Sequence, residues 1–98
     1  MTNYQTINVE TLKSLINQKD INLIDVREVN EYEANHISQA KNIPLSVLEY
    51  NIDKFNKDEH YYIICRSGNR SGQACHYLSN FDIETTNIDG GMLDWEAL

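Results

Sequence analysis

The sequence predicts an α/β fold in which helices flank a mainly parallel central sheet of about five strands. Short apolar or β-branched runs alternate along the 98 residues with segments whose apolar side chains recur at helical spacing. A single Pro and four Gly interrupt these runs, so each interruption marks a boundary. Strands that alternate with helices form βαβ units, and the strands of such units lie parallel.

Each element follows from a local pattern. The predicted strands are rich in apolar, β-branched or aromatic residues and cover residues 4–7, 21–26, 40–43, 61–64 and 85–88. The predicted helices cover residues 9–19, 28–34, 45–52, 71–79 and 92–98. Three residues set boundaries: Asn8 caps the first helix, Asn35 closes the second in a left-handed conformation, and Pro44 stops the third strand.

Composition and charge limit the function. Ninety-eight residues predict one domain spanning 1–98. The net charge of −7 argues against nucleic acid and anionic membranes as partners, although a local site can still bind a small anion. No apolar run approaches the roughly 20 residues of a membrane span, and residues 1–6 lack the apolar core of a signal peptide. We therefore expect a cytoplasmic protein.

The cysteines and histidines are too scattered for a metal centre. Cys65 and Cys75 do not pair with histidines at the spacing of a zinc site, and we expect neither a metal nor another cofactor. In a reducing compartment both thiols should be free. Cys75, on the inner face of a predicted helix, is expected in the core rather than as a second reactive thiol.

A polar loop between a strand and a helix is the strongest candidate site. Such a loop turns backbone N–H groups inward, and the helix dipole that follows adds positive potential, so the loop can hold an anion. The candidate residues are Cys65, Arg66, Ser67, Gly68, Asn69 and Arg70.

The first residue of this loop is a candidate nucleophile. The N–H groups and the cations Arg66 and Arg70 should lower the pKa of Cys65 and favour its thiolate. In the alternative interpretation Cys65 is a core cysteine and the two arginines are surface charges. The two arginines and Gly68, so close to the cysteine, favour the functional interpretation.

Loop length indicates the kind of substrate. Four residues separate Cys65 from Arg70, whereas cysteine-dependent phosphatases place five residues between these two positions. The shorter loop suits one additional sulfur atom on the cysteine better than it suits a bound phosphate.

These residues resemble a family, the single-domain rhodaneses, which are sulfurtransferases with a three-layer α/β fold. The resemblance covers nearly the whole chain. It is carried in order by Asp25-Val26-Arg27-Glu28 with Glu31-Tyr32, by His36-Ile37 with Ala40 and Asn42-Ile43-Pro44-Leu45, by the loop Cys65 to Ser71, and by Gly90-Gly91 with Trp95. Asn35 and Gln39 stand where the family commonly has Gly, at positions remote from the expected chemistry.

The resemblance implies a thiosulfate:cyanide type of sulfurtransferase. Cys65 would take sulfur from an anionic donor such as thiosulfate, carry it as a persulfide and pass it to cyanide or to a small or protein thiol. The N–H groups of residues 66–70 would stabilise the persulfide, and Arg66 and Arg70 would attract the donor. The chain would act as a monomer or a homodimer.

Two residues at a neighbouring strand end are supporting candidates. Asp25 and Arg27 should lie at the same sheet edge as Cys65, because carboxyl ends of parallel strands meet there. Arg27 can add charge to the site, or it can pair with Asp25 or Glu28 and brace the loop, which we favour.

Two other functions stay open at this point. One is a non-catalytic binding or sulfur-sensing module, which the presence of Cys65 argues against. The other is a cysteine-based phosphatase or arsenate reductase, which the loop length argues against.

Overall fold

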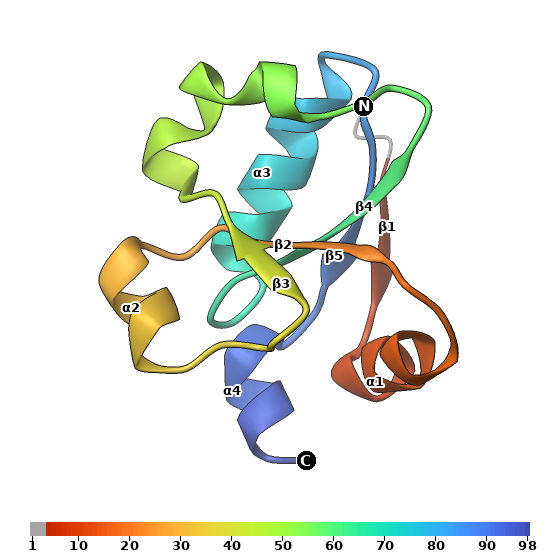
Figure 1. The fold of residues 1–98 in the computed structure, drawn as a ribbon, viewed down its shortest axis with the longest axis vertical. Helices are drawn as coiled ribbons and strands as arrows, with labels where there is room; N and C mark the ends of the chain where they lie inside the picture. Colours follow the sequence, from red (N-terminus) through yellow and green to blue (C-terminus); the bar gives the residue numbers. More distant parts are fainter. Residues whose placement is uncertain (1–3) are drawn as a thin grey trace.

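The centre of the protein is a five-stranded parallel sheet with the strand order β1-β5-β4-β2-β3 (Figure 1). The computed structural model describes residues 4–98. The strands are β1 (Tyr4–Ile7), β2 (Asn22–Asp25), β3 (Ala40–Asn42), β4 (His60–Ile64) and β5 (Glu84–Ile88). Every pairing between neighbouring strands is parallel, which confirms the predicted α/β fold class.

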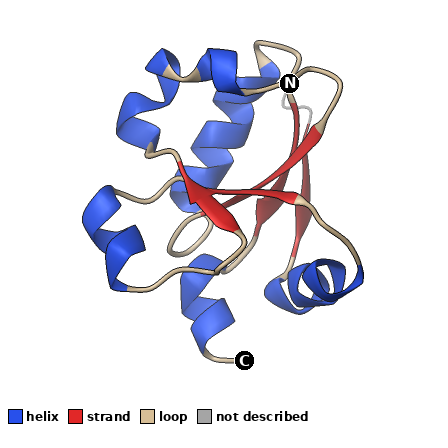
Figure 2. Ribbon diagram, viewed as in Figure 1, coloured by secondary structure: helices blue, strands red, loops and turns tan. Residues whose placement is uncertain are grey.

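Helices cover both faces of this sheet (Figure 2). They are α1 (Val9–Gln18), α2 (Val29–Ala34), α3 (Asn69–Ser79), α4 (Gly91–Glu96) and the 3₁₀ helices η1 (Leu45–Tyr50) and η2 (Ile52–Lys54). Among residues 4–98, none of these helices is long and apolar enough to cross a membrane.

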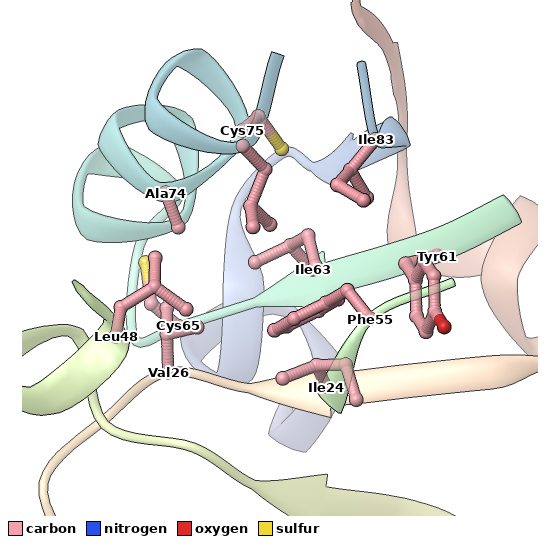
Figure 3. Packing of buried hydrophobic residues seen from close by; sticks show 11 residues of the cluster. Ile24, Val26, Leu48, Phe55, Tyr61, Ile63, Cys65, Ala74, Cys75 and Ile83 are labelled. Carbon is pink, nitrogen blue, oxygen red and sulfur yellow. The ribbon is translucent and has the colours of Figure 1, made fainter. Parts of the chain in front are cut away.

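Alternating side chains of the central strands feed two separate hydrophobic cores. Ile24 and Ile63 point to the face covered by α3, η1 and η2, where they pack with Leu48 (Figure 3). Leu23 and Ile64, each the sequence neighbour of one of these, point to the face covered by α1 and α4. Both central strands are therefore buried on both sides, which is the reason that each has apolar residues at consecutive positions, Leu23-Ile24 and Ile63-Ile64.

Two predicted helices differ from the structure in their start or in their helix type, and the other three agree with it to within two residues at each end. The helix predicted from residue 71 begins at Asn69, because Gly68 takes a left-handed conformation with φ +109° and turns the chain into the helix two residues earlier. The helix predicted over residues 45–52 is instead the pair of 3₁₀ helices η1 and η2. Periodicity placed the apolar residues on one face correctly but did not distinguish the two helix types.

The predicted left-handed conformation of Asn35 is wrong. Its backbone is extended, with φ −170° and ψ 132°. In this conformation its N–H donates to the Glu31 carbonyl at 3.4 Å and its own carbonyl accepts from the Arg27 guanidinium at 2.7 Å. Any residue adopts an extended backbone, so glycine is not needed at this position.

The carboxyl ends of the central strands meet at one edge of the sheet. Asp25, the last residue of β2, is in register with Ile64, the last residue of β4. Cys65 follows Ile64 directly and so leaves the middle of the sheet at the edge where ligands bind in parallel α/β folds.

The cap of α1 gives a first prediction. Asn8 has an extended backbone, and its side-chain oxygen accepts from the Thr11 N–H at 2.9 Å, as predicted from the sequence. Asn8→Ala should lower the free energy of unfolding by about 1 kcal/mol in urea denaturation, because the Thr11 N–H loses its acceptor. Asn17→Ala, the same change on an exposed position of the same helix, should cause no loss; equal losses in both variants would contradict the cap.

Candidate active site

The Cys65 side chain lies buried at the carboxyl end of β4, with 1% of its surface exposed. Its Sγ is 3.1 Å from the Gly68 N–H and 3.2 Å from the Ser71 hydroxyl oxygen. The polar groups around this sulfur therefore come from the loop itself and from the first turn of α3.

Hydrogen bonds around this sulfur favour the thiolate. Burial by itself raises the pKa of Cys65, but the Ser71 hydroxyl and the N–H groups of Ser71, Gly68 and Ser67 outweigh it and hold the pKa below that of an ordinary cysteine. The groups that lower the pKa of Cys65 most are these neutral donors, and the charge of Arg70 adds an attraction of the kind that the sequence predicts. Neutral N–H groups stabilise a buried anion without adding a buried charge of their own.

Backbone hydrogen bonds from α4 also hold the loop in position. The N–H groups of Met92 and Leu93 donate to the carbonyls of Cys65 and Arg66 at 2.8 and 3.0 Å. A Cβ on Gly91, whose φ is +53°, would lie 2.4 Å from the Cys65 carbonyl oxygen. Gly91 therefore permits the start of α4 to approach the backbone of the cysteine itself.

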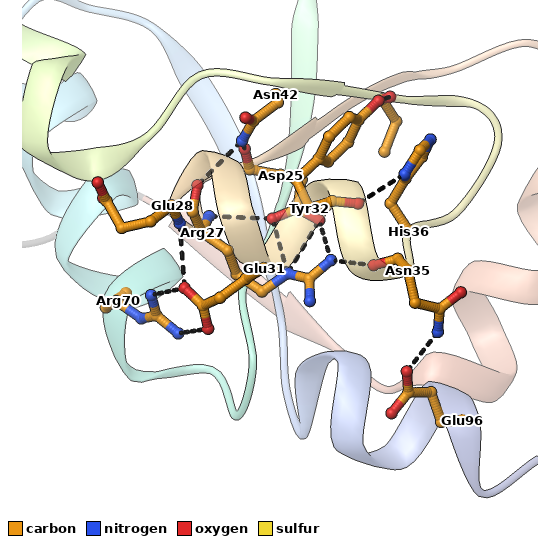
Figure 4. Close-up of polar contacts among 11 residues, drawn as sticks. Asp25, Arg27, Glu28, Glu31, Tyr32, Asn35, His36, Asn42, Arg70 and Glu96 are labelled. Carbon is orange, nitrogen blue, oxygen red and sulfur yellow. Dashed lines mark hydrogen bonds and ion pairs between the residues drawn. The ribbon is translucent and has the colours of Figure 1, made fainter.

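The two arginines of the loop have different surroundings. The Arg70 guanidinium binds both carboxylate oxygens of Glu31 on α2, at 2.6 and 2.9 Å (Figure 4). This hydrogen-bonded pairing lowers the pKa of Glu31 to about 2. Arg66 is exposed, and among the described residues its guanidinium has no hydrogen bond or ion pair.

Asp25 and Arg27 form the buried ion pair that the sequence reasoning favoured. Arg27 Nη2 lies 2.8 Å from Asp25 Oδ2, and Nε lies 3.1 Å from both carboxylate oxygens. The same guanidinium donates to the Asn35 carbonyl, and the Asn42 side chain donates to the Arg27 carbonyl. The pair thus ties β2 to α2 and β3, and its hydrogen bonds do not reach the 65–71 loop directly.

The remaining predicted residues divide between the rim and the core. Ser67 and Asn69 are exposed at the rim of the loop. Cys75 is fully buried on α3, and burial is the main reason that its pKa rises to about 11. Its position agrees with the core role predicted for it.

Two residues of the site were not singled out from the sequence. The Ser71 hydroxyl donates to Asn87 Oδ1 at 2.5 Å, and Asn87 Nδ2 donates to the Gly68 carbonyl at 3.3 Å. Ser71 stood inside the loop motif without an assigned role. Asn87 is a polar residue next to buried Ile88 in a central strand, and this contrast is the signal that could have identified it.

Together, these features define a class of parallel α/β proteins in which a strand-to-helix loop surrounds a buried cysteine with hydrogen-bond donors. Residues 8–98 match the family model for the rhodanese-like domain. The chain belongs to the rhodanese-like domain family, as the resemblance of its motifs predicted.

Similar proteins agree with this assignment. The chain is 38% identical to the Bacillus subtilis protein named "Putative sulfurtransferase YtwF", over 93% of this chain and 89% of that protein. A rhodanese-like domain protein from Staphylococcus aureus has a crystal structure with a TM-score of 0.88 and 37% identity, covering 93% of this chain and 90% of that one. The chain spans 49% of a longer relative, the Bacillus subtilis protein named "Putative sulfur carrier protein YrkF", at 35% identity.

The ion pair between Arg70 and Glu31 predicts a pH-dependent stability. Because the folded-state pKa of Glu31, about 2, lies below its ordinary 4.5, the pair stabilises the fold above pH 4.5 and loses this effect as the pH falls towards 2. Glu31→Gln should therefore lower the urea midpoint at pH 7, and its difference from the wild type should shrink steadily below pH 4.5.

A matched control separates this effect from a general change in charge. Glu33→Gln removes a charge from an exposed position on the same helix and should leave the urea midpoint almost unchanged. A Glu31→Gln difference that stays constant from pH 7 to pH 2.5 would show that the ion pair is not its cause.

Proposed function

We propose that this chain is a sulfurtransferase that carries sulfane sulfur as a persulfide on Cys65. The observation that supports it most is the set of hydrogen-bonding groups around one sulfur atom, with the Gly68 N–H at 3.1 Å and the Ser71 hydroxyl oxygen at 3.2 Å from Sγ. Donors so placed favour the thiolate, which is the nucleophilic form of cysteine. The names of similar proteins agree with this activity.

In the first half-reaction the Cys65 thiolate attacks the outer sulfur of the donor. With thiosulfate, a bond forms between Sγ and that sulfur while the sulfur–sulfur bond of the donor breaks, and sulfite leaves with the bonding electron pair. The persulfide that results carries its negative charge on the outer sulfur, at the mouth of the loop. The N–H groups that begin α3 are available to this charge, because the first N–H groups of a helix have no partner within it.

In the second half-reaction a nucleophile removes the outer sulfur. Cyanide or a thiolate forms a bond to that sulfur, the bond to Sγ breaks, and Sγ receives the electron pair as a thiolate. The same donors that activate Cys65 in the first step stabilise it here as the leaving group. The cycle consumes no cofactor.

The charges at the loop distinguish the roles of its two arginines. Both terminal nitrogens of the Arg70 guanidinium bind Glu31, so the positive charge of Arg70 is largely compensated. Its role is to fix the first turn of α3 against α2. Arg66 is exposed at the loop and is the cation available to attract a small anionic donor. The acceptor in the cell is a small thiol or a protein thiol.

Intact mass after incubation with thiosulfate tests the proposal. The wild-type protein should gain the mass of one sulfur atom, and added cyanide should remove it with release of thiocyanate. Cys75→Ala should behave like the wild type, and Cys65→Ser should gain nothing. A folded wild-type protein that takes up no sulfur from thiosulfate or polysulfide would contradict the proposal; turnover of an aryl phosphate would then point to a phosphatase.

The role of Arg66 gives a second prediction. Arg66→Ala should lower kcat/KM for thiosulfate by roughly tenfold at low ionic strength, because the donor is a dianion, and the difference should shrink as salt screens the charge. Lys57→Ala removes the same charge at the amino end of β4, away from the loop, and should have almost no effect. Equal losses in both variants would mean that overall charge, and not Arg66, attracts the donor.

A further inference from the structure

The hydrogen bonds of Asn87 define the direction in which the neighbouring hydroxyl points. Asn87 lies on β5 with 8% of its surface exposed, and its Nδ2 donates to the Gly68 carbonyl at 3.3 Å. The reverse orientation of the amide would set two carbonyl oxygens against each other. The amide oxygen therefore faces Ser71, at 2.5 Å from the hydroxyl.

Ser71 lies between two groups and has one hydrogen to give. Its hydroxyl oxygen is 2.5 Å from Asn87 Oδ1 and 3.2 Å from Cys65 Sγ. An amide oxygen can only accept, so the hydrogen between Ser71 and Asn87 belongs to Ser71. The hydroxyl then presents a lone pair to the sulfur, and the Cys65 thiol donates its own hydrogen to Ser71.

When Cys65 is a thiolate, the hydrogen bond between the sulfur and Ser71 has to run the other way, because a thiolate has no hydrogen and can only accept one. For Ser71 to stabilise the charged sulfur, its O–H bond has to turn from Asn87 to Sγ. We propose that Asn87 is a positioning residue that holds the Ser71 hydrogen while Cys65 is a thiol or a persulfide and gives it up when the sulfur becomes a thiolate.

The proposal deepens the proposed sulfur transfer and adds one movement to each half-reaction. When the thiol ionises, its proton leaves to water and the Ser71 O–H rotates to the sulfur, with no bond broken at Ser71. When the persulfide forms, Sγ becomes a neutral divalent sulfur and the hydrogen returns to Asn87. When the acceptor takes the outer sulfur, Sγ leaves as a thiolate and the hydrogen turns to it again.

Few other groups near this sulfur can produce the same effect. Arg70 and Cys75, both on α3, are the titratable groups of the described chain whose charge interacts with that of Cys65. The side chains that face the sulfur from the segment after β2 and from η1 are those of Val26 and Leu48, which are apolar (Figure 3). Replacing Asn87 with an uncharged residue that cannot accept a hydrogen bond therefore changes the direction of the Ser71 hydrogen without altering a neighbouring charge.

Variants at the two positions test this competition. The readout is the pH dependence of alkylation of Cys65, measured by peptide mass, which gives the pKa of the thiol without any sulfur donor. Asn87→Leu removes the competing acceptor and keeps the same branched side-chain skeleton, and it should lower this pKa by about one unit, a tenfold rise in the thiolate fraction at neutral pH. Ser71→Ala should raise it. The double variant should match Ser71→Ala, because Asn87 acts only through Ser71.

Asn87→Asp provides a second variant of nearly the same shape. It keeps an acceptor on Ser71, makes it stronger and adds a negative charge near the sulfur, and both changes should raise the pKa of Cys65. An unchanged or lowered pKa in this variant would overturn the proposal. An unchanged or raised pKa of Cys65 in Asn87→Leu would also overturn it. The same holds if Asn87→Leu shifts the pKa of Cys65 equally in a protein in which Ser71 is already Ala. Because the thiol titration needs no sulfur transfer, failure of the persulfide assay and failure of this proposal give different results.

Discussion

A buried sulfur atom that has to carry a negative charge imposes the main requirement on this structure. With 1% of its surface exposed, Cys65 cannot rely on water to stabilise its thiolate. The protein replaces that water with the N–H groups of Ser67, Gly68 and Ser71 and with the Ser71 hydroxyl. The N–H groups are effective because the short loop gathers them around one atom, and the Ser71 hydroxyl lies within reach of the same atom.

Most of the surrounding contacts keep those donors in place. The carbonyls of Cys65 and Arg66 bind the backbone of α4, and Gly91 permits this approach because a side chain there would collide with the Cys65 carbonyl. Arg70 is fixed to Glu31, so α2 supports the first turn of α3. Two segments outside the loop, α2 and α4, thus fix its position.

The sequence predicted the fold class and the position of the reactive loop, since both depend on local patterns. Alternating strands and helices indicate a parallel sheet, and the run from Cys65 to Arg70 after strand 61–64 could be located by its spacing. The Asp25–Arg27 pairing was predictable because the two residues are close in sequence and follow a buried strand.

Several of the predictions that failed or were missed depend on contacts that a local sequence pattern does not contain. The extended backbone of Asn35 depends on Arg27, and the pairing of Arg70 depends on Glu31, 39 residues before it. The role of Asn87 requires β5 to lie beside β4, which places its amide next to the start of α3. Composition and spacing contain no information on such contacts until the strand order is known.

The central claim is that neutral donors of the loop hold the Cys65 sulfur as an anion. Titration of the free protein, followed by the ultraviolet absorbance of the thiolate, tests it most directly, with Cys65→Ser to assign the transitions. Cys65 should ionise below the ordinary range of cysteine, and Cys75 should ionise near pH 11. A Cys65 thiol that ionises at or above the ordinary value would show that the loop does not stabilise the anion.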